Sequence, residues 1–122
     1  WVSFTCRDGT HTSAGDHIAD CARFLDAEPQ VVAMGINCVA PDQVTSLLRE
    51  IATASRKPVV VYPNSGEVWN AERRCWEGTA SRFTVYLAEW LDAGARWIGG
   101  CCRTTPADIR VVRGVVDARA VA

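Results

Sequence analysis

The chain has 122 residues, of which 48% are hydrophobic and 22% are charged. That length and balance are typical of a single folded domain with an apolar core. The formal net charge of −1 excludes the strongly basic surface by which proteins bind nucleic acids or acidic membranes, and the apolar runs are too short to span a bilayer. We expect a cytoplasmic protein, because six cysteines in an apolar and regular sequence fit cytosolic thiols better than secreted disulfides. Because Trp1 already lies in an apolar stretch, we also expect the chain to be an excerpt of a longer one.

Two apolar stretches, Trp1 to Thr5 and Val31 to Ile36, predict the first two strands. Between them, the segment from Asp16 to Ala27 has the spacing of an amphipathic helix. Its apolar residues recur at intervals of three and four, at Ile18, Ala22 and Leu25. The sequence therefore begins with a strand, a helix and a second strand.

A second helix is predicted from Pro41, a residue suited to a first helical turn, and a third strand from Pro58 to Tyr62. The apolar stripe of that helix consists of Val44, Leu47, Leu48 and Ile51. The third strand contains a continuous run of three valines, which is typical of a strand buried on both faces.

A third helix is predicted from Ser81, a fourth strand from Arg96 to Ile98, and a fourth helix from Thr105. Gly94 lies where the third helix needs a left-handed cap. Asp108 stands three residues after Thr105, a spacing close to a capping box. The apolar stripes consist of Phe83, Leu87, Trp90 and Leu91 in the third helix and of Ile109, Val112 and Val116 in the fourth.

Strands that alternate with helices predict an α/β fold with a parallel sheet and right-handed crossovers. Two architectures fit: a small open doubly wound sheet, or half of an eight-stranded barrel. We treat residues 1–122 as one segment, because the sequence has no linker and no low-complexity tract. In both architectures the functional residues gather at the carboxyl ends of the strands.

The connection from Pro63 to Thr79 is much longer than a strand-to-helix loop requires. Long loops in compact α/β domains are usually functional. This loop contains Trp69 and Trp76. Their large side chains could close over a ligand, or they could simply pack the loop onto the scaffold.

Three of the six cysteines, Cys38, Cys101 and Cys102, lie at equivalent ends of the second and fourth predicted strands. Three thiolates are a complete protein ligand set for a zinc ion whose fourth position stays open for catalysis. The preceding Gly99 and Gly100 permit a sharp turn. A helix that begins at Thr105 would favour the thiolate of Cys102. The spacing therefore predicts a catalytic zinc site.

Other interpretations of the cysteines remain open. Each could be a small buried hydrophobic residue, the six together could form a secreted disulfide framework, or Cys101 and Cys102 could form a redox pair. Cytosolic thiols, some of them bound to metal, fit the apolar and regular sequence better than a disulfide framework does. The remaining cysteines, Cys6, Cys21 and Cys75, have no matching geometry, and we expect them to be inert.

The sequence contains no phosphate-binding or dinucleotide-binding glycine motif and no nucleophile elbow. His11 and His17, the only histidines, do not pair obviously with a nucleophile. Asp8, Glu67 and Arg103 follow predicted strands, where charged side chains could serve function or simply be solvated.

Four segments together resemble the C-terminal half of the homocysteine S-methyltransferase family. They are Ser3 to Asp8, Gly35 to Cys38, Val60 to Glu67 and Gly99 to Pro106. The combination of Gly-Ile-Asn-Cys with Gly-Gly-Cys-Cys is highly specific. The segment Tyr-Pro-Asn-Ser-Gly-Glu, followed by Trp76, is most similar to the branch that uses S-methylmethionine or S-adenosylmethionine.

The resemblance implies a (β/α)8 TIM barrel, of which the chain supplies the C-terminal four βα units. It also implies a zinc ion held by Cys38, Cys101 and Cys102. The expected reaction is zinc-dependent transfer of a methyl group from a sulfonium donor to the thiolate of homocysteine, which gives methionine. The polar residues expected on the same face, and therefore our candidates for substrate contacts, are Asn37, Tyr62, Asn64 and Arg103.

The first four βα units of that family are absent from the 122 residues. Half a barrel leaves two unpaired sheet edges and an uncovered core, which folded proteins avoid. We therefore expect the missing N-terminal half of the barrel, or a second copy of the chain, to complete the fold. The alternative is a half-barrel fragment or assembly module without catalytic activity of its own.

Overall fold

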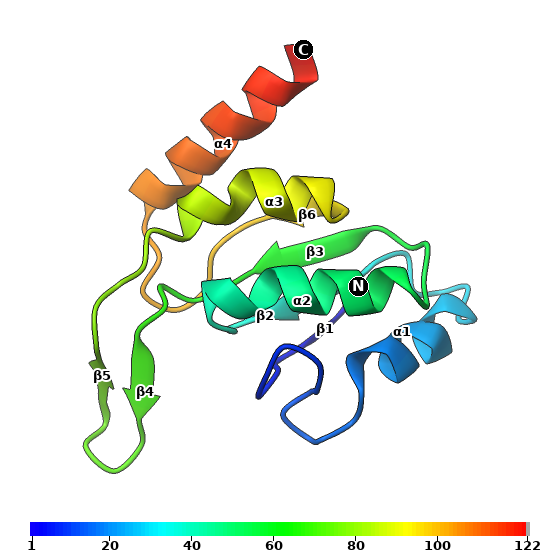
Figure 1. Cartoon of the computed structure of the whole chain (residues 1–122), viewed down its shortest axis with the longest axis horizontal. Helices are drawn as coiled ribbons and strands as arrows, with labels where there is room; N and C mark the ends of the chain where they lie inside the picture. Colours follow the sequence, from blue (N-terminus) through cyan, green and yellow to red (C-terminus); the bar gives the residue numbers. More distant parts are fainter. Residues whose placement is uncertain (122) are drawn as a thin grey trace.

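The computed structural model describes residues 1–121, which form a sheet with helices packed against it and a separate hairpin (Figure 1). The elements of the sheet layer and the hairpin are β1 (Val2–Phe4), β2 (Met34–Asn37), β3 (Val59–Tyr62), β4 (Val68–Asn70), β5 (Cys75–Glu77) and β6 (Ala95–Ile98). The helices are α1 (Ile18–Asp26), α2 (Pro41–Ala52), the 3-10 helix η1 (Phe83–Tyr86), α3 (Leu87–Asp92) and α4 (Pro106–Val121).

The main sheet is parallel and has the order β1-β2-β3-β6, which is also the order of these strands along the chain. The predicted α/β fold with a parallel sheet is therefore confirmed. A doubly wound sheet reverses its strand order at a switch point and carries helices on both faces. Within residues 1–121 the order does not reverse, and right-handed crossovers then place the connecting helices on one face.

The core lies between that face of the sheet and the helices. Ile36 of β2 and Val61 of β3 are buried there, and Trp90 of α3 is fully covered. The predicted apolar stripe of α2 is buried along its whole length: Val44, Leu47, Leu48 and Ile51. Burying one such side chain contributes roughly 1.5–3 kcal/mol, so the amphipathic pattern accounts for the position of this helix.

The helix starts show where individual hydrogen bonds, some of them from distant segments, override the periodic pattern. α1 begins at Ile18 because His17 is its cap: His17 Nδ1 accepts a hydrogen bond from the Ala19 backbone (3.3 Å). The helix predicted from Ser81 begins later, as η1, because the Ser81 backbone N–H donates to Ser65 O (2.7 Å). α4 starts as predicted, with the Thr105 N–H donating to the Asp108 carboxylate (2.8 Å).

Two further predictions need correction. The second strand begins at Met34 rather than Val31, and Val32 is largely exposed. The connection after β3 is not a plain loop but contains the antiparallel hairpin of β4 and β5. Trp69 and Trp76 face each other across this hairpin, with ring centroids 5.6 Å apart, and Figure 1 shows the hairpin projecting away from the sheet. The two rings therefore pack against each other within the hairpin.

The face of the sheet opposite the core is open. The exposed fractions of Trp1, Val32 and Trp97 are 71%, 68% and 51%, and these side chains line one hollow together with Val60.

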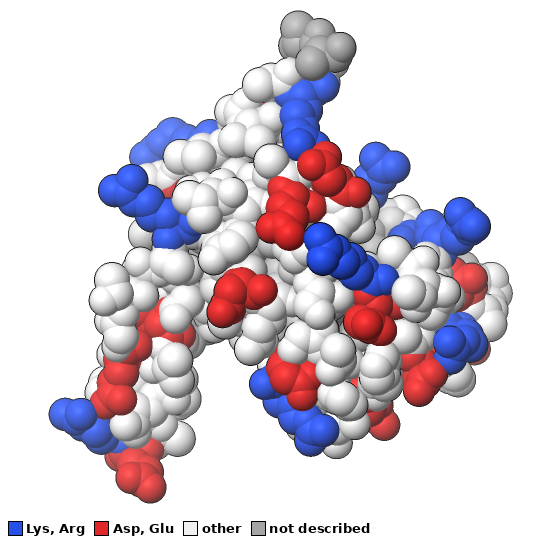
Figure 2. All heavy atoms as spheres, in the orientation of Figure 1, with Lys and Arg blue, Asp and Glu red and all other residues white. Residues whose placement is uncertain are grey.

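Charges of both signs are interspersed on the face drawn in Figure 2. Among residues 1–121, no helix combines the length and the apolar character needed to cross a membrane.

Candidate metal centre

The central strand β3 positions both cysteine segments at the carboxyl edge of the sheet. The Cys38 N–H donates to Tyr62 O (3.1 Å), at the end of β3. On the other side, the Cys101 N–H donates to Pro63 O (2.8 Å). One short run of backbone therefore holds two segments that are 63 residues apart in sequence.

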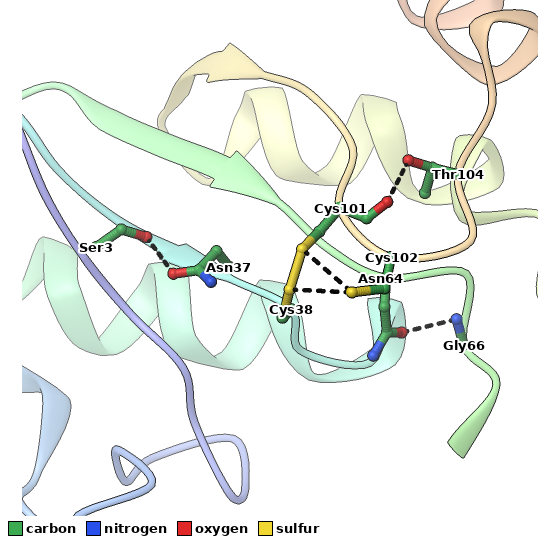
Figure 3. The surroundings of a disulfide bond; sticks show 8 residues. All are labelled: Ser3, Asn37, Cys38, Asn64, Gly66, Cys101, Cys102 and Thr104. Atoms are coloured by element: carbon green, nitrogen blue, oxygen red, sulfur yellow. Dashed lines mark hydrogen bonds between the residues drawn. A yellow bond between two sulfur atoms is a disulfide. The ribbon is translucent and has the colours of Figure 1, made fainter. Parts of the chain in front are cut away.

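The three sulfur atoms of Cys38, Cys101 and Cys102 lie within 4.8 Å of one another. Cys38 and Cys101 form a disulfide, with their Cα atoms 5.6 Å apart. The Cys102 sulfur lies 3.8 Å from each of the other two sulfurs (Figure 3). The structure thus brings together the three residues that the sequence selected as metal ligands, while the ligation itself stays a prediction.

The disulfide differs from the expectation of three free thiols. Two of the sulfurs are oxidised, so the structure represents the oxidised arrangement of the cluster. It also corrects the proposed redox pair, because Cys101 is joined to Cys38 rather than to the adjacent Cys102. The two strand ends place the Cα atoms of Cys38 and Cys101 within the usual range for a disulfide.

Two residues at this edge adopt left-handed backbone conformations that are uncommon for residues other than glycine. They are Cys38 (φ 51°) and Arg103 (φ 65°). Such conformations cost energy and persist only where surrounding contacts enforce them. Gly100 has a different role here: a Cβ atom at that position would overlap the Thr104 side chain, whose hydroxyl donates to Cys101 O (2.7 Å). The turn is therefore closed by tight packing.

Two of the four predicted substrate contacts lie together on the open face of the sheet. Asn37 and Tyr62 are partners in the register of β2 and β3. The Ser3 hydroxyl donates to Asn37 Oδ1 (2.7 Å), as Figure 3 shows. Tyr62 borders a hollow of about 360 Å³ whose wall also includes Trp97 and Gly99.

The other two, Asn64 and Arg103, are engaged in loop contacts. Asn64 is buried, and its Oδ1 accepts a hydrogen bond from the Gly66 N–H (2.8 Å). The Arg103 guanidinium forms two hydrogen bonds with Glu67, from Nε (3.1 Å) and from Nη2 (3.2 Å). The structure therefore does not bring all four candidates to one surface.

The family profile described as homocysteine S-methyltransferase matches residues 1–116. The chain belongs to the homocysteine S-methyltransferase family. A relative named homocysteine S-methyltransferase 3, from Arabidopsis thaliana, is 45% identical over 121 residues, which cover 96% of this chain and 35% of the relative. Homocysteine S-methyltransferase from Escherichia coli K12 is 46% identical over 116 residues, with 93% and 37% covered. The chain thus spans little more than a third of the curated relatives it matches.

Solved structures of the Escherichia coli homocysteine methyltransferase MmuM are similar to this family member. The oxidised form matches with a TM-score of 0.78 and 44% identity, over 94% of this chain and 35% of that one. The metallated form matches with a TM-score of 0.76 and 42% identity, over 93% and 34%. Each match thus covers more than nine-tenths of this chain but only about a third of the solved structure.

The interaction between Glu67 and Arg103 is a feature of this edge that the sequence did not reveal. Hydrogen bonds from Arg103 and from the Ser65 hydroxyl hold the pKa of the Glu67 carboxyl below its usual range. The only signal in the sequence was that both charged residues follow strands of the same sheet. Periodicity could not show that one pairs with the other.

Cys6 and Cys21 lie where burial disfavours the thiolate, and the expected inertness of Cys6, Cys21 and Cys75 stays a prediction. Burial, together with the charge of Asp8, raises the pKa of Cys6 to about 11, and burial also raises the pKa of Cys21. A raised pKa reduces the fraction of reactive thiolate. The histidines have local roles as well, because His17 caps α1 and His11 lies against Asp8 (3.2 Å).

Proposed function

We propose that this chain supplies the metal-binding edge of a homocysteine S-methyltransferase. The complete protein would transfer a methyl group from S-methylmethionine or S-adenosylmethionine to the thiolate of homocysteine and release methionine. The observation that carries this proposal is the convergence of Cys38, Cys101 and Cys102 at the carboxyl edge of a parallel sheet. Membership of the family supports it.

We propose zinc as the metal and these three cysteines as its ligands. The donor set fits, because thiolates are preferred zinc ligands. A tetrahedral zinc site with Zn–S bonds of ~2.3 Å separates its sulfurs by about 3.8 Å. Cys102 already lies 3.8 Å from both other sulfurs, so after reduction of the disulfide only the Cys38 and Cys101 sulfurs would have to move apart to share one ion with it.

A bound zinc ion would supply the acidity that converts the homocysteine thiol to a thiolate at neutral pH. The homocysteine sulfur then forms a bond to the methyl carbon of the donor. The bond from that carbon to the sulfonium sulfur breaks at the same time, and its electron pair stays on the departing sulfide. The chain's own contribution is to align the two substrates, from which much of the rate advantage would come.

Asn37 and Tyr62 are the residues we propose for direct contact with substrate. They adjoin Cys38 on the open face of the sheet, and the Ser3 hydroxyl occupies only the amide oxygen of Asn37. The amide N–H groups of Asn37 therefore remain available as donors to a substrate carboxylate. For Asn64 and Arg103 we propose an indirect role, because both are engaged in loop contacts.

We propose that residues 1–122 are the C-terminal half of a TIM barrel, completed by the rest of the protein or by a second copy. The apolar side chains on the open face, such as Trp1 and Trp97, support this proposal, and so do the unpaired edges of β1 and β6. We also propose a cytoplasmic location, because the proposed zinc ligands must be reduced and that compartment keeps thiols reduced.

The function is tested with a chimera in which this chain replaces the matching segment of the Escherichia coli homocysteine S-methyltransferase. With zinc, reductant, homocysteine and S-methylmethionine or S-adenosylmethionine, the chimera is expected to form methionine, measured by mass spectrometry. The matched variant Cys102→Ser is expected to form none, whereas Cys75→Ser is expected to remain active. A folded chimera without activity toward both donors would contradict the proposal.

The proposed partner is tested on the 122-residue chain itself by chromatography with light scattering. A mass of twice the monomer would indicate that a second copy covers the open face. A monomer that dimerises only after addition of the N-terminal part of the Escherichia coli enzyme would support completion by the rest of a longer protein.

A further inference from the structure

We infer that Glu67 and Arg103 form a clamp that positions Cys102 for joint metal binding with Cys38 and Cys101. This inference rests on the proposed metal site and assigns the clamp a positioning role. We call this pair, with the Ser65 hydroxyl that supports it, the Glu67–Arg103 clamp.

The clamp has the geometry of a specific interaction rather than a casual surface contact. Arg103 Nε donates to Glu67 Oε2 (3.1 Å) and Nη2 donates to Oε1 (3.2 Å), so both carboxylate oxygens are engaged in the two-pronged manner of arginine. The Ser65 hydroxyl donates to the same Oε2 (2.7 Å). Three hydrogen bonds thus determine the orientation of one carboxylate.

The carboxylate of the clamp is also the best sheltered of those in ion pairs. The Glu67 side chain is only 11% exposed, while Arg103 is 53% exposed. In the other ion pairs formed by residues 1–121, the acidic side chain is at least 34% exposed. Shielding from solvent strengthens a charged hydrogen bond, so this pair can hold its loop in place where the exposed pairs cannot.

Cys102 depends on this support more than the other two cysteines do. Cys38 and Cys101 are hydrogen-bonded through their own N–H groups to the end of β3. Cys102 is exposed, and its carbonyl accepts a hydrogen bond from the Ser65 N–H (3.1 Å). The next residue is Arg103, whose φ of 65° is maintained only under constraint.

The clamp therefore acts on Cys102 from both sides. The Ser65 backbone N–H donates to the Cys102 carbonyl. The Ser65 hydroxyl donates to the Glu67 carboxylate. Glu67 in turn holds the side chain of Arg103. Without Glu67, the backbone at Arg103 could relax to an ordinary conformation, and the Cys102 sulfur would move relative to the other two.

The test measures the zinc dissociation constant of the reduced 122-residue chain by competition with a coloured chelator. Glu67→Gln is expected to raise this constant by about tenfold, the effect typical of residues that orient metal ligands. The matched control is Glu77→Gln, the same change in an acid that pairs with the exposed Arg73. The control is expected to change zinc affinity by less than about twofold, because exposed ion pairs contribute little.

A double-mutant cycle separates positioning from a general loss of structure. Arg103→Gln removes an exposed side chain and leaves the core intact, so it provides a second variant if Glu67→Gln fails to fold. If the two residues act as one clamp, the variant with both changes binds zinc no more weakly than either single variant. Losses that add in the double variant would overturn the inference.

Replacing zinc with cobalt adds a spectroscopic measurement. The absorption of the bound cobalt would not change if Glu67 only stabilised the fold. The sulfur-to-cobalt charge-transfer absorption reports the number of thiolate ligands, and it is expected to weaken in Glu67→Gln because Cys102 is bound to the metal for a smaller fraction of the time. Wild-type zinc affinity and absorption in a folded Glu67→Gln variant would overturn the clamp alone. Failure of the reduced wild-type chain to bind zinc would overturn the proposed metal site, and the clamp with it.

Discussion

The two edges of the parallel sheet carry polar groups of different kinds. At the amino edge, Lys57 Nζ donates to the carbonyl of Leu25 (2.6 Å) and to that of Glu28, and so closes the end of α1. Asp26 accepts hydrogen bonds from the Ser55 hydroxyl (2.7 Å) and the Arg56 N–H (3.1 Å). Each of these groups completes the hydrogen bonding of a helix end or a loop.

The carboxyl edge is built in another way. Its distinctive side chains are three cysteines whose sulfurs meet one another, and two of its residues have left-handed backbones. Among the described residues, the amino edge has no such cysteine cluster and no left-handed residue other than glycine. The comparison teaches that one edge is organised to stabilise the fold, while the other holds reactive groups in a constrained arrangement.

The largest expected effect is on zinc affinity, which a substitution at the carboxyl edge should lower and one at the amino edge should not. Cys101→Ser is expected to weaken zinc binding of the reduced chain by more than about 100-fold, because it removes a ligand rather than a neighbour of one. Lys57→Met, at the amino edge, is expected to leave zinc affinity unchanged. Isothermal titration of both variants measures the difference, and equal zinc affinities would break the comparison.

The sheet that joins the edges is tested by Gly35→Ala in β2. A Cβ atom at Gly35 would overlap the backbone carbonyl of Val60 in β3, so we expect a loss of about 2–3 kcal/mol in the free energy of unfolding. The matched change Gly114→Ala, in open space on α4, is expected to stabilise the chain by about 0.5–1 kcal/mol. Urea unfolding measures both, and a loss in both variants would contradict the packing argument.

The stabilising role of the amino edge is tested by Lys57→Met. The change leaves the carbonyls of Leu25 and Glu28 without their charged donor, and we expect it to cost about 1 kcal/mol of unfolding free energy. Arg56→Met is the control, because Arg56 contacts Asp26 through its backbone N–H, which the substitution keeps. A similar loss in both variants would show that the ammonium group has no special role.

The smallest expected effect is a dependence of stability on pH. Hydrogen bonds from Ser55 and Arg56 lower the pKa of Asp26 from its ordinary value of 3.8. Because the pKa is lower in the folded state, the stabilisation is present above pH 3.8 and is lost as the pH falls through the folded-state value. Thermal unfolding in acid should therefore show a shallower loss of stability in Asp26→Asn than in wild type. Ser55→Ala should show an intermediate loss, and a loss as steep as wild type in Asp26→Asn would contradict this account.

Particular residues show how far prediction from the sequence could reach. The stripes of α1 and α2 and the valine run of β3 were predicted correctly, since burial follows directly from the spacing of apolar side chains. The boundaries of β2 and η1 were not, because contacts from distant segments, such as Ser65 with Ser81, decide where an element begins.

By itself, the sequence determined the alternation of strands and helices and the placement of Cys38, Cys101 and Cys102 after two strands of one sheet. Periodicity and chain order carry that information, because both are local properties. Only the tertiary structure decided that Cys38 pairs with Cys101, that Trp69 faces Trp76, and that Glu67 holds Arg103. Each of these contacts depends on the register of strands and the course of loops, which arise only when distant parts of the chain pack together.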